Sequence, residues 1–208
     1  MAEQASGSGA RLTQRGQVTR ERILRAAADM MYVRGVASTT LDEIRAASQT
    51  SKSQLYRHFP AKEALVRGVV ALQAAAVLED QRQLLRSVGS LQGLDRWRDA
   101  LIEDSALRNG AYGCRLGTLA SELADQDEDA RQKIVQHFNT WEGLLKAGLE
   151  RMKSAGVLRG EADSEELATG LMAALQGGYL LAQTTRSVKP MKIALDMAID
   201  HIKTFAVP

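Results

Sequence analysis

The sequence predicts an all-α protein of about nine helices, with an N-terminal three-helix helix-turn-helix module and a larger C-terminal helical domain. Three observations support this fold class. The 208 residues include only three prolines and are rich in Ala, Leu and Met, which favours long helices over turn-rich β-structure. Apolar residues recur at spacings of three and four, and no stretch alternates as a strand would. Helix-capping residues precede several of the periodic segments.

The first 17 residues are rich in Gly, Ser, Ala and Gln, so we expect a disordered N-terminal arm there. Arg11 and Arg15 lie in this arm. They are either solvated charges or a basic extension that reaches into a DNA minor groove. The helical period begins at Thr19, and Gly35 is a natural stop for this first helix.

Caps and breakers place the next three helices at about residues 41–47, 52–58 and 61–84. Thr40 and Glu43 have the spacing of a capping box, in which the side chain of each residue binds the backbone N–H of the other. Ser51 is the N-cap of the third helix. Pro60 pushes the residue before it out of the helical region and so ends that helix.

Five further helices are predicted beyond residue 90. They span about 91–108, 116–124, a segment from Asp125 or Asp127 to before Gly156, 164–185 and 190–205. The Asn-Gly pair at 109–110 breaks the first of them. Asp163 with Glu166 repeats the capping pattern, and a proline at position 190 suits the first turn of the last helix. No internal repeat is visible.

The charge distribution changes near residue 63, which favours a division into a DNA-binding domain at 18–63 and a second, slightly acidic domain at 64–208. The whole chain carries a net charge of only +2, which alone argues against nucleic acid. However, residues 1–63 hold ten basic and six acidic side chains, a net of +4, whereas residues 64–208 hold seventeen and nineteen, a net of −2. The basic excess is therefore confined to the proposed DNA-binding region.

The third helix has the residue types that a helix needs to read a major groove. Its first turn offers Ser, Lys and Gln side chains that can hydrogen-bond base edges, while Leu55 and Phe59 face inward. Residues near its end and at neighbouring helix starts suit phosphate contact. The candidate DNA-binding residues are Thr40, Ser51, Lys52, Ser53, Gln54, Tyr56, Arg57, His58 and Lys62.

The stretch TTLDEIRAASQTSKSQLYRHFPAKEAL, at 39–65, resembles the DNA-binding signature of the tetracycline-repressor (TetR) family. That signature is approximately T-T-x-x-x-I-A-x-x-A-G-V-S-x-x-x-L-Y-x-H-F-x-x-K-x-x-L. The matching positions are Thr39, Thr40, Ile44, Ser51, Leu55, Tyr56, His58, Phe59, Lys62 and Leu65.

The chain departs from this signature in the turn, where Ser48, Gln49 and Thr50 replace the usual Ala-Gly-Val. Without the glycine, Gln49 is expected to adopt a backbone conformation that costs some strain. The Thr50 hydroxyl replaces a buried methyl group and therefore needs a hydrogen-bond partner.

Two C-terminal stretches, residues 113–117 (GCRLG) and 174–183 (ALQGGYLLAQ), are similar to the LmrA/YxaF-like branch of the family. The resemblance implies a regulatory domain over most of residues 90–205 that binds small, often aromatic molecules. Aromatic residues of this domain either pack the core or line a ligand cavity with a few polar groups. The candidate ligand-binding residues are Trp97, Leu101, Tyr112, Cys114, Leu116, His137, Phe138, Trp141, Gln176 and Tyr179.

Small residues at spacings of three and four in the segment 164–185 permit close approach of another helix. Together with the final helix, at 190–205, this segment can form a two-helix face. In a two-fold dimer, two such faces form a four-helix bundle, and the family resemblance supports this placement. The candidate interface residues are Gly170, Ala174, Gly178, Leu181, Leu195, Ile199 and Ile202.

Other classes of site find little support. One cysteine excludes an intramolecular disulfide framework and suits a reducing cytosol. A redox role for Cys114 beside Arg115 is an alternative to a buried pocket wall, but the chain has no second cysteine to resolve it. The three histidines are isolated, so no metal site is expected. No membrane span or secretion signal stands out, so we expect a cytoplasmic protein. No phosphate-binding loop or catalytic constellation stands out either, so we expect no cofactor.

These features predict a homodimeric transcriptional regulator that responds to a small, aromatic or hydrophobic molecule, with a repressor favoured over an activator. Two-fold symmetry implies a palindromic DNA operator with half-sites about 34–36 Å apart, or a multiple of that distance. The family resemblance implies that ligand binding shifts the fourth helix and changes the spacing of the two DNA-reading helices. A DNA-binding protein without an inducer and a helical enzyme remain alternatives.

Overall fold

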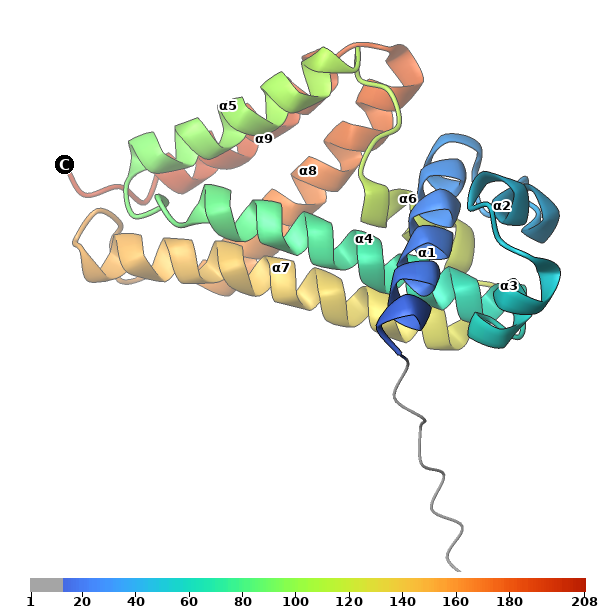
Figure 1. Cartoon of the computed structure of the whole chain (residues 1–208). Coiled ribbons are helices and arrows are strands. Elements are labelled where there is room, and N and C mark those ends of the chain that lie inside the picture. Colours follow the sequence, from blue (N-terminus) through green and yellow to red (C-terminus); the bar gives the residue numbers. More distant parts are fainter. Residues whose placement is uncertain (1–12) are drawn as a thin grey trace, which may run out of the picture.

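The computed structural model describes residues 13–208, and these residues form nine helices (Figure 1). The prediction of an all-α fold is confirmed, with one isolated β-bridge between Leu158 and Ala206. The helices are α1 (Gln14–Arg34), α2 (Leu41–Ala47), α3 (Lys52–His58), α4 (Lys62–Leu85), α5 (Leu91–Leu107), α6 (Arg115–Leu123), α7 (Glu128–Ser154), α8 (Ser164–Thr185) and α9 (Lys189–Lys203).

The first helix begins five residues before the predicted start. Thr13 is its N-cap, and the Thr13 side chain accepts a hydrogen bond from the backbone N–H of Gly16 at 3.2 Å. Residues 14–17, which were expected in a disordered arm, are therefore helical, and Arg15 lies on α1. Arg11 lies outside the described residues. The early start follows from the cap at Thr13, which stabilises the first turn although the apolar period begins later.

The three N-terminal helices form one end of the molecule, and α4 connects them to the larger domain. In Figure 1, α1–α3 gather around one end of α4, whereas the C-terminus lies at the opposite end of the molecule. Helix α1 packs on α4, and α4 also packs on α5, α6 and α7. Helix α4 therefore contacts both parts of the chain.

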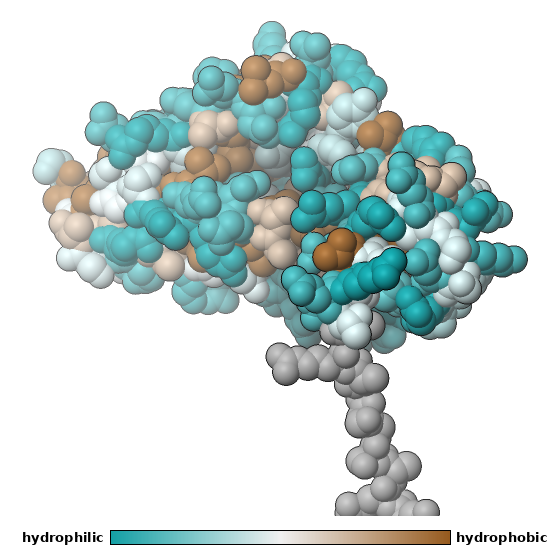
Figure 2. All heavy atoms as spheres, viewed as in Figure 1, coloured by the Kyte–Doolittle hydropathy of each residue, from teal (hydrophilic) through white to brown (hydrophobic). Residues whose placement is uncertain are grey.

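The larger domain is a helical bundle whose apolar faces meet in one core. The long helices α4 and α7 pack against each other, α7 packs on α8, and α9 lies between α8 and α5 (Figure 1). The indole rings of Trp97 and Trp141 are fully buried in it. Figure 2 shows hydrophilic side chains over most of the visible face, with hydrophobic residues in small separate patches. No helix within residues 13–208 is long and apolar enough to cross a bilayer.

Candidate nucleic-acid interface and adjoining cavity

The start of α2 is fixed by the predicted capping box. The Thr40 hydroxyl accepts a hydrogen bond from the Glu43 N–H at 3.3 Å, and the Glu43 carboxylate accepts from the Thr40 N–H at 2.9 Å. Hydrogen bonds from Thr40, supplemented by one from Arg34, lower the pKa of the Glu43 carboxyl to about 2. The Thr40 side chain is therefore already engaged within the protein, which leaves it less free for the phosphate contact predicted from the sequence.

Both expectations about the turn between α2 and α3 are confirmed. Gln49 has a φ of 50°, in the left-handed region that favours glycine. The buried Thr50 hydroxyl shares a hydrogen bond of 2.9 Å with the Ser48 hydroxyl. The departures at Ser48 and Thr50 therefore compensate each other in part, because Ser48 supplies the partner that Thr50 requires.

Helix α3 presents a polar face outward and an apolar face inward. Leu55 and the adjoining Phe59 are buried, whereas the side chains of Lys52, Ser53 and Arg57 are exposed. The other exposed residues of the predicted set are Thr40, Ser51 and Tyr56. This arrangement leaves one side of α3 free to enter a groove while the other side anchors it.

Gln54 lies in the first turn of α3, where it is partly buried. Its side-chain oxygen accepts a hydrogen bond from the Ser51 N–H at 2.8 Å, which completes a second capping box. The capping bond occupies the oxygen and leaves the amide N–H₂ group as a donor. In this conformation Gln54 suits acceptors on a base edge, such as guanine O6 or N7, better than the paired donor and acceptor of adenine.

His58 and Lys62 lie at the junction of α3 and α4. The His58 Nε2 atom is buried without a hydrogen-bond partner among the described residues, and burial together with the charges of Arg57 and Arg20 lowers its pKa. A neutral, inward-facing imidazole is a weaker phosphate contact than the sequence suggested. Lys62 is the first residue of α4, whose N-cap Ala61 provides no side-chain cap, so positive charge and free backbone N–H groups coincide there.

A cavity of about 380 Å³ lies in the larger domain and extends to the end of α1. Its walls come from α4, α5, the connection between α5 and α6, the first residue of α6, α7, α8, and Tyr32 of α1. Of the predicted ligand-binding residues, Leu101, Cys114, Trp141 and Tyr179 line it. Sequence reasoning missed Tyr32, Gln81 and Arg108. Gln81 could have been found, since it lies three residues after buried Leu78 and four before buried Leu85, at an inward position of α4.

A second cavity of about 910 Å³ lies between α6, α7 and α8. Phe138 and Gln176 line it, together with Cys114 and Tyr179, which also line the first cavity.

The remaining predicted ligand-binding residues are not brought together by the fold. Trp97 and Leu116 are fully buried in the core, and neither lines one of the two cavities. Tyr112 is partly exposed and packs on Tyr32, with ring centroids 5.5 Å apart. His137 is partly buried on α7 and lines neither cavity. The sequence could not separate these residues because core and cavity positions share the same apolar face of each helix.

The buried Cys114 is poorly suited to a redox role. Burial raises the pKa of its thiol, which keeps it protonated at neutral pH. Its sulfur accepts a hydrogen bond from the Gly117 N–H at 3.3 Å, as the cap of α6. Among residues 13–208, no group of three His, Cys, Asp or Glu side chains is arranged to hold a metal ion.

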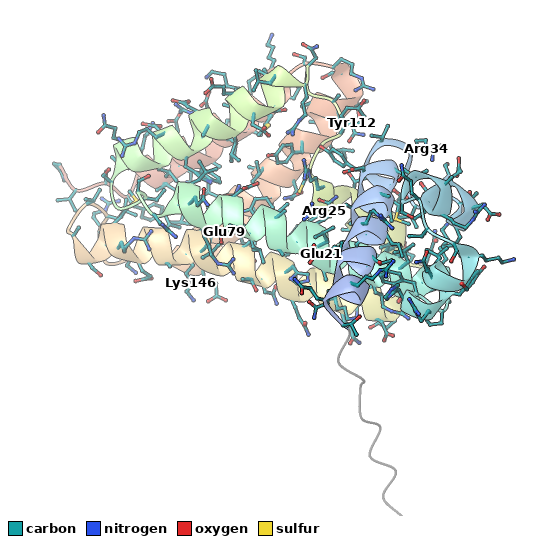
Figure 3. The ribbon with its side chains drawn as sticks, viewed as in Figure 1. Glu21, Arg25, Arg34, Glu79, Tyr112 and Lys146 are labelled. Atoms are coloured by element: carbon teal, nitrogen blue, oxygen red, sulfur yellow. The ribbon has the colours of Figure 1, made fainter. Side chains whose placement is uncertain are left out.

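The end of α1 is joined to the larger domain by specific contacts. The Tyr32 hydroxyl donates to the carbonyl of Gly113 at 3.3 Å, and the Arg115 guanidinium lies 5.2 Å from the Tyr32 ring centroid. Close by, the Val36 N–H donates to the Glu122 carboxylate at 2.7 Å. Figure 3 shows Tyr112, on the connection between α5 and α6, near the end of α1. Tyr32 therefore belongs both to the wall of the cavity and to the first helix of the N-terminal module.

Several of the predicted dimer-interface residues face inward within one chain. Leu195, Ile199 and Ile202 are fully buried, so in this conformation they cannot contact a second subunit. Gly178 is buried against α9, where an added Cβ would lie 2.9 Å from Met191 Cα. The small residue therefore permits close packing of α8 and α9 in the same chain. Gly170 and Leu181 stay on the exposed side of α8, and Ala174 is partly exposed.

Comparison with known proteins matches two family models to the chain. Residues 23–69 match "Bacterial regulatory proteins, tetR family", and residues 90–197 match "Transcriptional regulator LmrA/YxaF-like, C-terminal domain". Together they cover the helix-turn-helix module and most of the larger domain. The chain belongs to the TetR family. The resemblance seen in both halves of the sequence is confirmed, and the protein is a TetR-family helix-turn-helix transcriptional regulator.

Other TetR-type regulators are similar over most of the chain. The HTH-type transcriptional regulator LmrA of Bacillus subtilis (strain 168) is 24% identical over 83% of this chain and 90% of its own length. The HTH-type transcriptional repressor DhaR of Mycobacterium sp. (strain GP1) is 25% identical over 88% of this chain and 91% of its own length.

Solved structures of TetR regulators have the same fold. A TetR transcriptional regulator from Chloroflexus aurantiacus J-10-FL superposes with a TM-score of 0.78 at 23% identity, covering 93% of this chain and 98% of the other. The reduced form of E. coli NemR gives a TM-score of 0.74 at 26% identity, covering 91% and 97%.

Proposed function

We propose that this TetR-family regulator is a homodimeric repressor that binds a palindromic operator and leaves it when a small apolar molecule binds the larger domain. The observation that carries the proposal is the outward polar face of α3, with Lys52, Ser53 and Arg57 exposed and Leu55 buried beneath them. Residues 18–63 act as the DNA-binding domain and residues 64–208 as the ligand-binding and dimerisation domain. This division agrees with the basic excess in residues 1–63.

In this proposal each subunit places α3 in a major groove. Residues of its first turn read base edges, while Tyr56, Arg57 and Lys62 contact phosphates. Two-fold symmetry places the second α3 about one helical turn of DNA away, or a multiple of it, which is why the operator is palindromic. The regulator acts in the cytoplasm, where bacterial DNA is found.

Dimerisation uses the exposed apolar side of α8 and α9. Leu180, Leu181, Ile193 and Met197 are exposed in the single chain, and Met197 retains 69% of its accessible surface. Apolar side chains grouped on two adjacent helices favour an isologous contact in which the same surface of both subunits meets. The interface residues of α9 are therefore Ile193 and Met197 rather than the inward-facing residues predicted from the sequence.

The effector site is the 380 Å³ cavity that Tyr32 closes at the end of α1. A ligand there meets a side chain of the DNA-binding domain directly, and it alters the packing of Tyr32 on Gly113 and Arg115. The ligand weakens operator binding only to the extent that it binds the released conformation more tightly. A coupling of about 1–3 kcal/mol corresponds to roughly a 5–150-fold loss of operator affinity.

Selection of bound fragments from genomic DNA, followed by titration of the enriched sequence, tests this function. We expect a palindromic sequence bound by two subunits, and release by members of a panel of aromatic compounds. Enrichment of sequences without two-fold symmetry would contradict the proposed dimer on DNA. Tight operator binding that no compound changes would support a DNA-binding protein without an inducer instead.

A further inference from the structure

Gln81 of α4 is a buried polar residue in the wall of the 380 Å³ cavity. Only 4% of its surface is accessible. Its side-chain oxygen accepts two hydrogen bonds, from the indole N–H of Trp97 at 3.0 Å and from the indole N–H of Trp141 at 3.1 Å. Both rings are 1% exposed, so Gln81 is the partner that their buried N–H groups require.

These two bonds fix the orientation of the amide group. An indole nitrogen can only donate, so the Gln81 oxygen must face the two rings and the amide nitrogen must point away from them. The Gln81 amide nitrogen has no hydrogen-bond partner within residues 13–208. It keeps some accessible surface, unlike the polar side-chain atoms that are fully buried without a partner. Two N–H donors on a nearly buried residue therefore face the cavity and require an acceptor.

Other cavity groups indicate what kind of molecule supplies this acceptor. Leu84, Leu101 and Trp141 provide apolar walls. Asp104 is paired with Arg108, while Asp80 and Arg115 have no ion pair in the part of the chain that the structure describes. The two acidic and two basic side chains give the cavity lining no net charge, so the cavity favours a molecule without net charge. The Arg108 Nε–H is a further buried donor without a partner.

We propose that the cavity binds a neutral apolar molecule that carries a carbonyl oxygen, and that this oxygen accepts a hydrogen bond from the Gln81 amide. The proposal rests on the proposed function in taking this cavity as the effector site. Trp97 and Trp141 are positioning residues, because they hold the amide so that its donors face the ligand. A hydrocarbon of the same shape displaces water from these donors and leaves them unpaired, so it binds more weakly.

Calorimetric titration with two matched probes tests this assignment without DNA. The probes are 2-acetonaphthone, which has a carbonyl oxygen, and 2-ethylnaphthalene, which has nearly the same shape and no acceptor. We expect the ketone to bind about tenfold more tightly to the full-length protein, as one buried hydrogen bond predicts. A third probe, 2-naphthoate, should bind no more tightly than the ketone, because no cation in the cavity is left unbalanced.

Two substitutions at Gln81 separate hydrogen bonding from packing. Gln81→Glu, measured at pH 8, keeps an oxygen for both indoles and removes the donors. Gln81→Met removes the donors without adding charge; it also removes the acceptor of both indoles, so the fold of this variant is checked by circular dichroism. Either change should reduce ketone affinity to that of the hydrocarbon and leave hydrocarbon binding within about threefold. Gln92→Glu, on the exposed side of α5, adds the same charge outside the cavity and should leave both affinities unchanged.

Equal affinities of ketone and hydrocarbon for the unmodified protein, or no binding of any probe, would overturn the proposal. So would unchanged ketone affinity in both Gln81 variants. Tighter binding of 2-naphthoate than of the ketone would contradict the requirement for a neutral ligand. Operator binding by the same preparation tests the proposed function separately. A protein that discriminates the probes but selects no DNA would retain this inference and lose the proposed function.

Discussion

Gln49 shows how a single residue can carry strain within the DNA-reading module. Its φ of 50° places a side chain in the left-handed region, where a non-glycine residue costs about 1–2 kcal/mol. The backbone N–H of Gln49 binds the carbonyl of Ala46 at 3.1 Å, and that of Thr50 binds the carbonyl of Arg45, also at 3.1 Å. These bonds hold the turn between α2 and α3 in place despite the strain.

Gln49→Gly is therefore expected to stabilise the protein. Relief of the left-handed penalty outweighs the greater chain entropy of glycine, and the net gain in unfolding free energy is about 0.5–1 kcal/mol. Urea unfolding measures it. Gln136→Gly, at an exposed position inside α7, is the control and should cost about 1 kcal/mol. A destabilised Gln49→Gly variant would show that the Gln49 side chain makes a compensating contact.

At this residue scale the sequence predicted local features better than distant ones. The strain at Gln49 and the partner needed by Thr50 followed from short-range rules, and both are confirmed. The sharing of Gln81 between two indoles could not be predicted, because Gln81 and Trp141 are 60 residues apart. A polar residue at an apolar position of a helix indicates that it has a buried hydrogen-bond partner. Which residue is that partner depends on how three helices pack.

At the scale of elements, most helix ends were predicted closely because caps and breakers are local, whereas the start of α1 was placed five residues too late. Helix α2 begins after Thr40, α3 after Ser51 and α8 after Asp163, as their capping patterns require. The inward face of α8 and α9 was harder to assign. Both helices carry apolar residues on more than one side, so the pattern alone did not distinguish the core face from the exposed face.

The contact between α6 and Val36, which follows the end of α1, is the element-scale link that we expect to matter most for communication between the domains. Glu122→Ala removes the acceptor of the Val36 N–H and should lower the unfolding free energy by about 1–2 kcal/mol. Hydrogen exchange of the Val36 amide should become faster. Glu103→Ala, at an exposed position of α5, is the matched control. Unchanged protection of Val36 would mean that this contact does not hold α1 in place.

At the scale of the whole molecule, the proposed repressor consists of two subunits joined through α8 and α9. Met197→Glu introduces a charge at the centre of the proposed contact and should convert the dimer to a monomer at micromolar concentration, because an unpaired buried charge is costly. Sedimentation velocity measures the change. Val135→Glu, at an exposed apolar position of α7, should leave the dimer intact. An unchanged dimer in the Met197 variant would move the interface elsewhere.

The distribution of charge along the whole chain also bears on DNA binding. The net charge of the chain is only +2, but residues 1–63 alone carry a net charge of +4. A domain that neutralises phosphates releases bound counterions, so its affinity for DNA must fall as salt rises. Lys62, at the uncapped start of α4, is one of the residues proposed to make such a contact.

The most direct test is the salt dependence of operator affinity for the unmodified protein and for Lys62→Ala. We expect a steep negative slope of log K against log salt, reduced in magnitude by about 2 in the variant, because two subunits each lose one phosphate contact. Lys146→Ala, on α7 away from the module in Figure 3, should leave the slope unchanged. Weaker binding with an unchanged slope would contradict the role of Lys62. A flat slope for the unmodified protein would contradict the DNA-binding surface itself.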